Sequence, residues 1–176
     1  TQSRSSAASD VYKRQGLWRL VRLWMLVLAG NVCGAAVAAW VFAVLPVFPG
    51  PVDAAFQELG VKLMEYDAFT MFSKAILSGW LIATLVWVLS SIDQGKILMI
   101  FIVTYLMGLG DFPHIIVGSV EVLYLMFLGK LAVADALWTF GVPTLLGNLL
   151  GGTVIFALIS HAPVSYTHLT LPTIYS

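Results

Sequence analysis

The sequence predicts an all-α membrane protein in which one membrane helix is broken. Of the 176 residues, 60% are hydrophobic and only 10% are charged, whereas a soluble domain carries about 25% charged residues. The mean hydropathy is +0.93, and the apolar stretches leave room for roughly four or five spans of ~20 residues each. One apolar region is interrupted by Gly108–Glu121, which holds glycines, a proline, a histidine and two carboxylates. Such a break survives at membrane depth only inside protein or beside a water-filled cavity.

Charge and cysteine content exclude several classes of function. The formal net charge is zero, so nothing points to a nucleic-acid partner. The single cysteine, Cys33, excludes an intrachain disulfide and a cysteine-rich metal site, and no cofactor or metal is expected. The two ends are polar, unlike the apolar middle. We therefore expect residues 1–15 and 165–176 to be foreign or disordered, and residues 16–164 to form the membrane domain.

The first span is expected from about Trp18 to Leu45, as one long helix. Basic and aromatic residues at its start form an interface anchor. Gly30 and Gly34 lie four residues apart, and small residues at this spacing let another helix approach closely. The proline-rich run from Pro46 to Pro51 ends the helix.

A charged connector and a second span come next. Val52–Asp67 is amphipathic, so we expect a partly helical connector whose charges form a solvated face. The second span runs from about Ala68 to Leu89. Lys74 near its start is expected to snorkel to the interface, although it is also placed to point into a pore. A polar loop, Ser90–Lys96, ends this span.

The third apolar region, Ile97–Gly129, is too long for one straight span. We expect it to divide into two half-helices, Ile97–Leu109 and Ile115–Leu128, on either side of the break. Lys130–Pro143 is interpreted as a short connector or surface helix. The last span is expected at Pro143–Ser160, with its proline in the first helical turn.

Two segments of the chain share a sequence pattern. Gly30–Val37 in the first span and Gly147–Val154 in the last both have the pattern G-N-x-x-G-[AG]-x-V. The last span comes an odd number of spans after the first, so the two helices are expected to run in opposite directions, as in the inverted repeats of transporters. No broken helix precedes the first copy to match the break. We therefore expect the chain to be truncated at its front.

The ionisable residues of the break are the candidate site, because such residues at membrane depth usually mark a pathway for ions or substrate. A midplane imidazole at His114 can give a hydrogen bond or a proton to a small anion, since its unperturbed pKa of ~6.5 lies near neutrality. The alternative is a packed histidine satisfied by a backbone carbonyl, and we favour the transport role. Asp111 is expected to cap the second half-helix. For Glu121, pore-lining and structural roles both stay open.

Four further side chains near the break or inside the helices are singled out by the sequence. Asn31 and Asn148 are polar residues inside apolar helices, and interhelical hydrogen bonding is the simplest role for both. Met107 and Phe112 flank the break. They are candidates for an apolar constriction that gates by size and dewetting, although ordinary packing residues would have the same sequence.

These motifs resemble those of the formate/nitrite transporter family. The shared features are G-N-V-C-G-A in the first span, the pattern from Phe72 to Trp87, G-D-F-P-H-I-I-V-G-S at the break, and G-N-L-L-G-G-T-V-I-F-A-L in the last span. They keep the family's order and spacing over about Gly16 to Val164. The resemblance implies six spans in two inverted three-helix halves, an aquaporin-like shape, and pentamers with one pore per subunit.

On this resemblance the chain supplies spans three to six of six, the C-terminal two-thirds of the family fold, and its first span begins in the cytoplasm. Asn148 would then face the broken helix and hold the His114 loop in place. The break keeps the family's histidine but loses an adjacent glutamate and an asparagine, and the family's pore-vestibule lysine falls on Asp67. These departures indicate a divergent branch, and the G-S-V-E sequence at Gly118–Glu121 resembles that of the bacterial inner-membrane branch.

The leading hypothesis is a channel-like transporter of small monovalent anions in the bacterial inner membrane, homo-pentameric in the full-length protein, with the anion and the lipid bilayer as its partners. Half-helix ends and a central histidine would replace the anion's lost hydration between apolar constrictions. The expected pore or substrate-binding residues are His114, Phe112, Met107, Asn148, Glu121 and Asp67. The alternative is a membrane enzyme or structural subunit that uses His114 with Asp111 or Glu121. An enzyme would need a nucleophile or metal set that the sequence does not show.

Overall fold

The computed structural model describes the backbone of residues 2–160 and the side chains of residues 16–160, and every regular element in that part of the chain is a helix. The α-helices are α1 (Gln2–Val44), α2 (Gly50–Met64), α3 (Ala68–Ser91), α4 (Lys96–Leu109), α5 (Ile115–Phe127), α6 (Val133–Asp135), α7 (Val142–Leu149) and α8 (Phe156–Ser160). Two π-helical segments, η1 (Ala136–Gly141) and η2 (Leu150–Ile155), join the last three. The predicted all-α class is confirmed.

Within the described residues, three stretches are long and apolar enough to cross a membrane. They are Gly16–Val44 in α1, the whole of α3, and the continuous helical run Val133–Ser160 from α6 to α8. The two helices on either side of the break, α4 and α5, are apolar but shorter. Since each has fewer residues than the ~20 that a span needs, neither crosses a bilayer alone.

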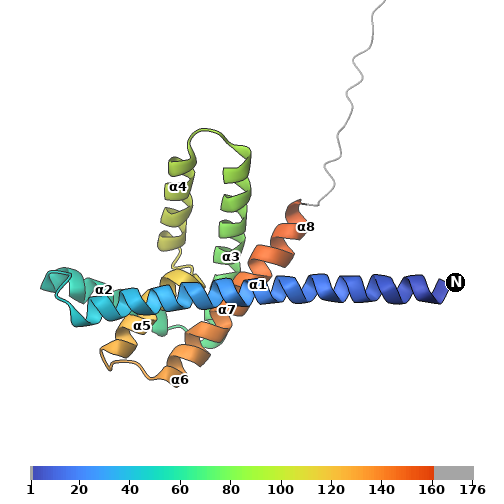
Figure 1. Ribbon diagram of the computed structural model, residues 1–176. Helices are drawn as coiled ribbons and strands as arrows, with labels where there is room; N and C mark the ends of the chain where they lie inside the picture. Colours follow the sequence, from blue (N-terminus) through green and yellow to red (C-terminus); the bar gives the residue numbers. More distant parts are fainter. Residues whose placement is uncertain (1, 161–176) are drawn as a thin grey trace, which may run out of the picture.

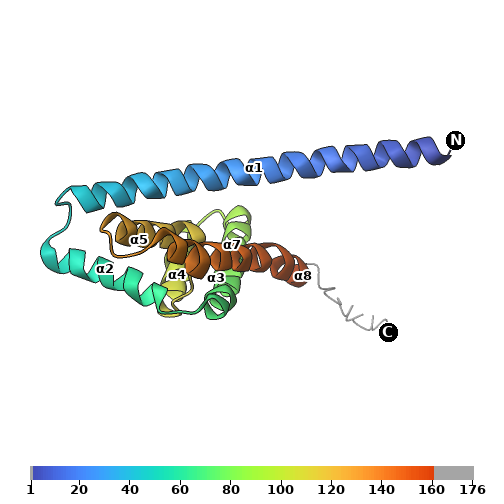
Figure 2. The ribbon, with the colours of Figure 1, turned by 90° about the horizontal axis from the view of Figure 1, so that it is seen from below.

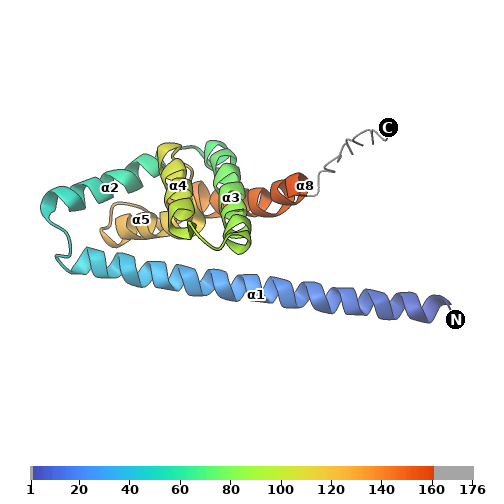
Figure 3. The same ribbon diagram turned by 90° about the horizontal axis from the view of Figure 1, so that it is seen from above.

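The helices form a layer from which one pair projects. Figures 2 and 3 show α5 between α1 and α2, and α5 packs against both. In Figure 1, α3 and α4 stand side by side and project away from this layer. The run from α7 to α8 crosses the base of α3, which is its main packing partner. The break between α4 and α5 therefore lies where the projecting pair joins the layer.

The predicted helix boundaries agree to within two residues for α3, α4 and α5, and they differ more at the start of α1 and of the last span. The connector predicted to be partly helical contains most of α2. α1 ends at Val44, one residue before the predicted end, but helical backbone begins at Gln2 rather than near Trp18. α2 has a proline in its first turn, where a missing N–H costs nothing. The predicted tail, 165–176, lies outside the described residues.

The last span begins ten residues earlier than predicted. The sequence assigned Lys130–Pro143 to a connector or a separate surface helix, but helical backbone runs without interruption from Val133 to Ser160 and joins this segment to the last span. The prediction that the span begins at Pro143 is wrong. It assumed that a proline does not lie inside a helix, because its ring normally clashes with the carbonyl four residues before it. Here the wider π-helical turn η1 ends at Gly141, two residues before Pro143, and the helix continues past the proline.

Glycines bring α3 and the last span into backbone contact. A Cβ added at Gly79 would collide with the backbone of Asn148, and one added at Gly151 would collide with the carbonyl of Ile76. The glycines of the G-N-x-x-G pattern in α7 and η2 therefore serve as a close-packing surface. In the first copy of the pattern, Gly30 and Gly34 have open space around them, so no described helix packs closely on these two glycines. Ala35 and Ala39, farther along the same helix, are buried.

Candidate functional site

A cavity of about 660 Å³ lies beside the break. Four of the residues that the sequence predicted for the pore line it: Met107, Phe112, His114 and Glu121. The remaining lining comes from α2, the turn after it, α3, α4, the break and the first turns of α5: Leu59, Lys62, Leu63, Tyr66, Ile82, Thr104, Gly108, Asp111, Pro113, Ile116, Val117 and Gly118. The cavity thus combines apolar walls with a few ionisable groups.

The break itself is a short non-helical run. α4 ends at Leu109 and α5 begins at Ile115, and the two helices point in different directions (Figure 1). Asp111 has a φ of 48°, a left-handed conformation in which a short polar residue is one of the few non-glycine residues tolerated. The Phe112 N–H donates to the Met107 carbonyl at 2.9 Å, which closes the end of α4.

The side chain of Asn148 binds the backbone at the end of the break that leads into α5. Its Nδ2 donates to the carbonyls of Pro113 and Ala75, at 3.2 and 2.9 Å, and to Ser78 Oγ at 2.9 Å. Its Oδ1 accepts the N–H of Ile115 at 2.9 Å, and the Ser78 hydroxyl donates to the Pro113 carbonyl at 2.5 Å. These bonds supply the backbone of the break with partners that lipid does not offer. The predicted interhelical role of Asn148 at the break is confirmed.

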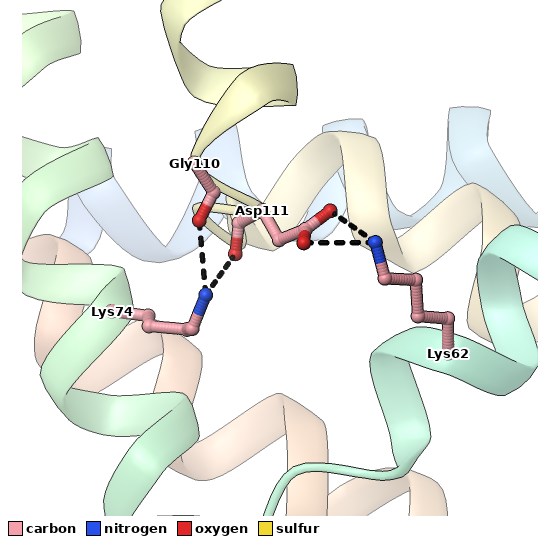
Figure 4. Close-up of polar contacts among 4 residues, drawn as sticks. All are labelled: Lys62, Lys74, Gly110 and Asp111. Atoms are coloured by element: carbon pink, nitrogen blue, oxygen red, sulfur yellow. Dashed lines mark hydrogen bonds and ion pairs between the residues drawn. The ribbon is translucent and has the colours of Figure 1, made fainter.

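The side chain of Lys74 binds the backbone at the end of the break that follows α4. Its ammonium donates to the Gly110 carbonyl at 2.9 Å (Figure 4) and lies 4.7 Å from the centroid of the Tyr66 ring and 5.9 Å from that of Phe112. The predicted snorkelling of this lysine is therefore wrong. The carbonyls at the end of α4 attract a cation because they carry the negative end of the helix dipole.

Asp111 does not cap α5, contrary to prediction. Its carboxylate oxygens lie 3.0 and 2.9 Å from Nζ of Lys62 on α2 (Figure 4). His114 occupies the N-cap position of α5 and makes no side-chain capping bond. The first N–H of α5 already donates to the Asn148 side chain, so it needs no bond from Asp111.

His114 and Glu121 are half-buried on the cavity wall. The carbonyl of His114 accepts the Gly118 N–H at 2.9 Å. Neither the imidazole of His114 nor the carboxylate of Glu121 has a hydrogen-bond or ion-pair partner within residues 16–160. Both side chains are therefore available to a small molecule in the cavity.

Asp67 and Asn31 have other roles in the structure. Asp67 caps α3, accepting from the N–H groups of Phe69 and Thr70 at 2.9 and 3.0 Å and from the Thr70 hydroxyl at 2.7 Å. The bonds from Thr70, first among these, hold the pKa of the Asp67 carboxyl below its ordinary value. Asp67 does not line the cavity. Asn31 donates to the Val27 carbonyl in its own helix, so the interhelical bond predicted for it is not formed within the described chain.

Sequence reasoning missed Lys62 as a site residue, because it assigned the charges of Val52–Asp67 to a solvated face. A usable signal was present: a carboxylate inside an apolar region needs a cationic partner. Few lysines lie near Asp111 in the chain, and the pairing with Lys62 spans 49 positions. The sequence indicated the need for a partner without identifying which lysine would meet it.

Comparison with known proteins identifies the family. Residues 6–162 match the family model described as formate/nitrite transporter. The chain is 49% identical over 145 residues to the inner membrane protein YfdC of Escherichia coli (strain K12), an alignment that covers 82% of this chain and 47% of YfdC. The chain therefore spans about half the length of this curated relative. No solved structure matches the chain.

The family match covers most of the chain and agrees with the all-helical fold and its long apolar helices. Proteins of this family are transporters and channels, which excludes the membrane-enzyme alternative. The chain belongs to the formate/nitrite transporter family of membrane proteins.

Proposed function

We propose that this chain forms part of a channel-like pore for small monovalent anions, of the formate or nitrite class, with His114 as its central polar group. One observation carries the proposal. The break beside His114 is anchored by the protein itself, through Asn148 and Lys74, and it lines a cavity of about 660 Å³. Non-helical backbone of this kind belongs in a membrane protein where it lines a solute path.

The start of α5 favours an anion. In this proposal α4 and α5 are the two halves of one interrupted membrane span. The backbone N–H groups of Ile116 and Val117 have no partner in the described part of the chain, and both residues line the cavity. Unpaired N–H groups at a helix N-terminus carry partial positive charge, which stabilises a nearby anion.

Met107 and Phe112 would form the apolar constriction on the cavity side of α4. An apolar narrowing admits a solute by size and excludes one that keeps its full hydration shell. The imidazole of His114 would then supply a hydrogen bond, or a proton, at the place where the anion has lost water.

Location and assembly are part of the proposal. The relative YfdC is described as an inner membrane protein, and we place this chain in the same membrane. We further propose a homo-pentamer with one pore per subunit. The open space around Gly30 and Gly34 agrees with a further helix packing on α1 in the assembled protein.

The experiment is anion flux into liposomes that contain the intact membrane protein carrying this chain. His114→Phe removes the polar group while filling similar space, and we expect loss of formate or nitrite flux or of its pH dependence. His114→Asn keeps a hydrogen-bond donor without an ionisable group, and we expect residual flux that no longer changes with pH. Unchanged flux and pH profile in the phenylalanine variant, at equal membrane insertion, would show that His114 is a packing residue.

A further inference from the structure

The ion pair between Lys62 and Asp111 lies on the wall of the cavity. Both residues belong to its lining, and their side chains are 55% and 40% exposed. Lys62 comes from α2 and Asp111 from the break, so the pair joins two elements that meet at the cavity (Figure 4). An anion in the cavity can reach the ammonium of Lys62, because that residue is part of the lining.

The backbone of Asp111 is held in place independently of this ion pair. Lys74 on α3 donates to the carbonyl of the preceding residue, Gly110, at 2.9 Å. Phe112, the following residue, donates its N–H to the end of α4. Lys62, in contrast, carries its charge on a flexible four-carbon stem. When the pair separates, the backbone of Asp111 therefore stays in place, whereas the ammonium of Lys62 can move away.

The group that Lys62 binds in the structure is a carboxylate, the same chemical group as formate. We propose that Lys62 is the anion-collecting cation of this cavity and that Asp111 acts as its built-in competitor, which a dissolved small carboxylate must displace. This inference rests on the proposed function. It goes further by naming the receiving group and the residue that limits its affinity.

The strength of the pair permits such an exchange. Exposed ion pairs are weak, because water screens both charges and two long side chains must be ordered. A dissolved anion at sufficient concentration can therefore replace Asp111. Since Asp67 is engaged in capping α3, it does not compete for Lys62 at this position.

The experiment measures binding and flux separately, with formate as the probe, in nanodiscs and liposomes that hold the intact protein. Binding is read from the line broadening of ¹³C-labelled formate. We expect Asp111→Asn to tighten formate binding about two- to five-fold, the range that the strength of exposed pairs allows. Lys62→Gln should weaken binding by a similar factor, and the double variant should behave like Lys62→Gln alone.

Two further variants test whether a change in formate binding comes from the loss of the Asp111 carboxylate. They control for misfolding and for the change of net charge. Asp111→Gly also removes the carboxylate, and its backbone adopts the observed positive φ without strain, so it serves if the asparagine variant folds poorly. Asp93→Asn makes the same change of charge in an exposed loop away from the cavity, and formate binding should stay at the wild-type value.

Each outcome decides one point. If removing the Asp111 carboxylate leaves formate binding unchanged or weakens it, or if it tightens binding equally without Lys62, the competition model is overturned. If binding follows the expected order while no variant conducts formate, the proposed transport function fails and the inference on Lys62 stands. Flux that follows the same order as binding supports both.

Discussion

Asn148 concentrates four hydrogen-bonding contacts on one side chain at the break. The residue satisfies the carbonyls of Pro113 and Ala75, the hydroxyl of Ser78 and the N–H of Ile115. An asparagine amide offers two donors and one acceptor oxygen, and each of these is used here. A residue that makes several bonds inside a membrane protein is expected to determine local geometry more than overall packing.

We expect Asn148→Ala to destabilise the protein by about 1–3 kcal/mol, because it leaves backbone groups of the break without a partner. Asn31→Ala is the matched control, since Asn31 has the same place in the sequence pattern but, within the described residues, its side chain bonds to its own helix. The measurement is equilibrium unfolding in mixed bicelles. Equal losses in the two variants would contradict the role assigned to Asn148.

The cap formed by Asp67 predicts a pH dependence outside the membrane spans. The pKa of Asp67 is lower in the folded chain than its ordinary value of 3.8, chiefly because Thr70 donates to the carboxylate. The capping contribution is therefore fully present above the ordinary pKa and is lost as pH falls through the folded pKa. We expect the start of α3 to loosen only in acid, below about pH 4.

Hydrogen-exchange protection of the Phe69 and Thr70 amides, compared at about pH 5 and about pH 3, measures this effect. Asp67→Asn is the control, because asparagine caps a helix about as well but does not titrate in this range. Protection in the wild type that stays constant down to about pH 3 would rule out the pH-sensitive cap.

At the scale of helices, the packing of α3 on the last span depends on the absence of side chains. We expect Gly151→Ala to prevent the observed contact, because its Cβ would collide with backbone rather than with a flexible side chain. Overpacking of this kind costs about 1–3 kcal/mol or more. Gly16→Ala is the matched control, since its Cβ would have open space in the described chain.

The yield of monodisperse protein in detergent and the midpoint of thermal unfolding measure this difference. A normal yield and midpoint for Gly151→Ala would mean that α3 and η2 do not pack as closely as described.

The sequence predicted the helices well where composition and local chemistry decide the structure. The apolar stretch of α3 and the proline-rich end of α1 are examples, because length, hydropathy and proline geometry act locally. Asn148 could also be assigned, since a polar group in an apolar helix needs a partner. The pairing of Lys62 with Asp111 and the early start of the last span at Val133 could not be predicted. The first depends on tertiary geometry, and the second on a π-helical turn that accommodates Pro143.

At the scale of the whole molecule, α1 and the run from α7 to α8 proceed in opposite directions (Figures 1 and 2). The two copies of the G-N-x-x-G pattern lie on these helices. We expect Gly30–Val37 and Gly147–Val154 to be related by a pseudo-two-fold axis in the membrane plane. An experimental structure of the intact protein, superposed on itself through these segments, tests this. A best rotation axis along the membrane normal would mean that the repeat is parallel.

The π-helical segments on either side of α7 have a consequence for comparing related sequences. A π-helical turn contains more residues than an α-helical one, so it can absorb one extra residue while the helix before and after it keeps its direction. A relative that is one residue shorter at Ala136–Gly141 or Leu150–Ile155 can therefore present the same face to α3. Single-residue gaps in an alignment belong at these two turns. A gap placed inside Val142–Leu149 would align Asn148, which binds the backbone of the break, with the wrong residue of the relative.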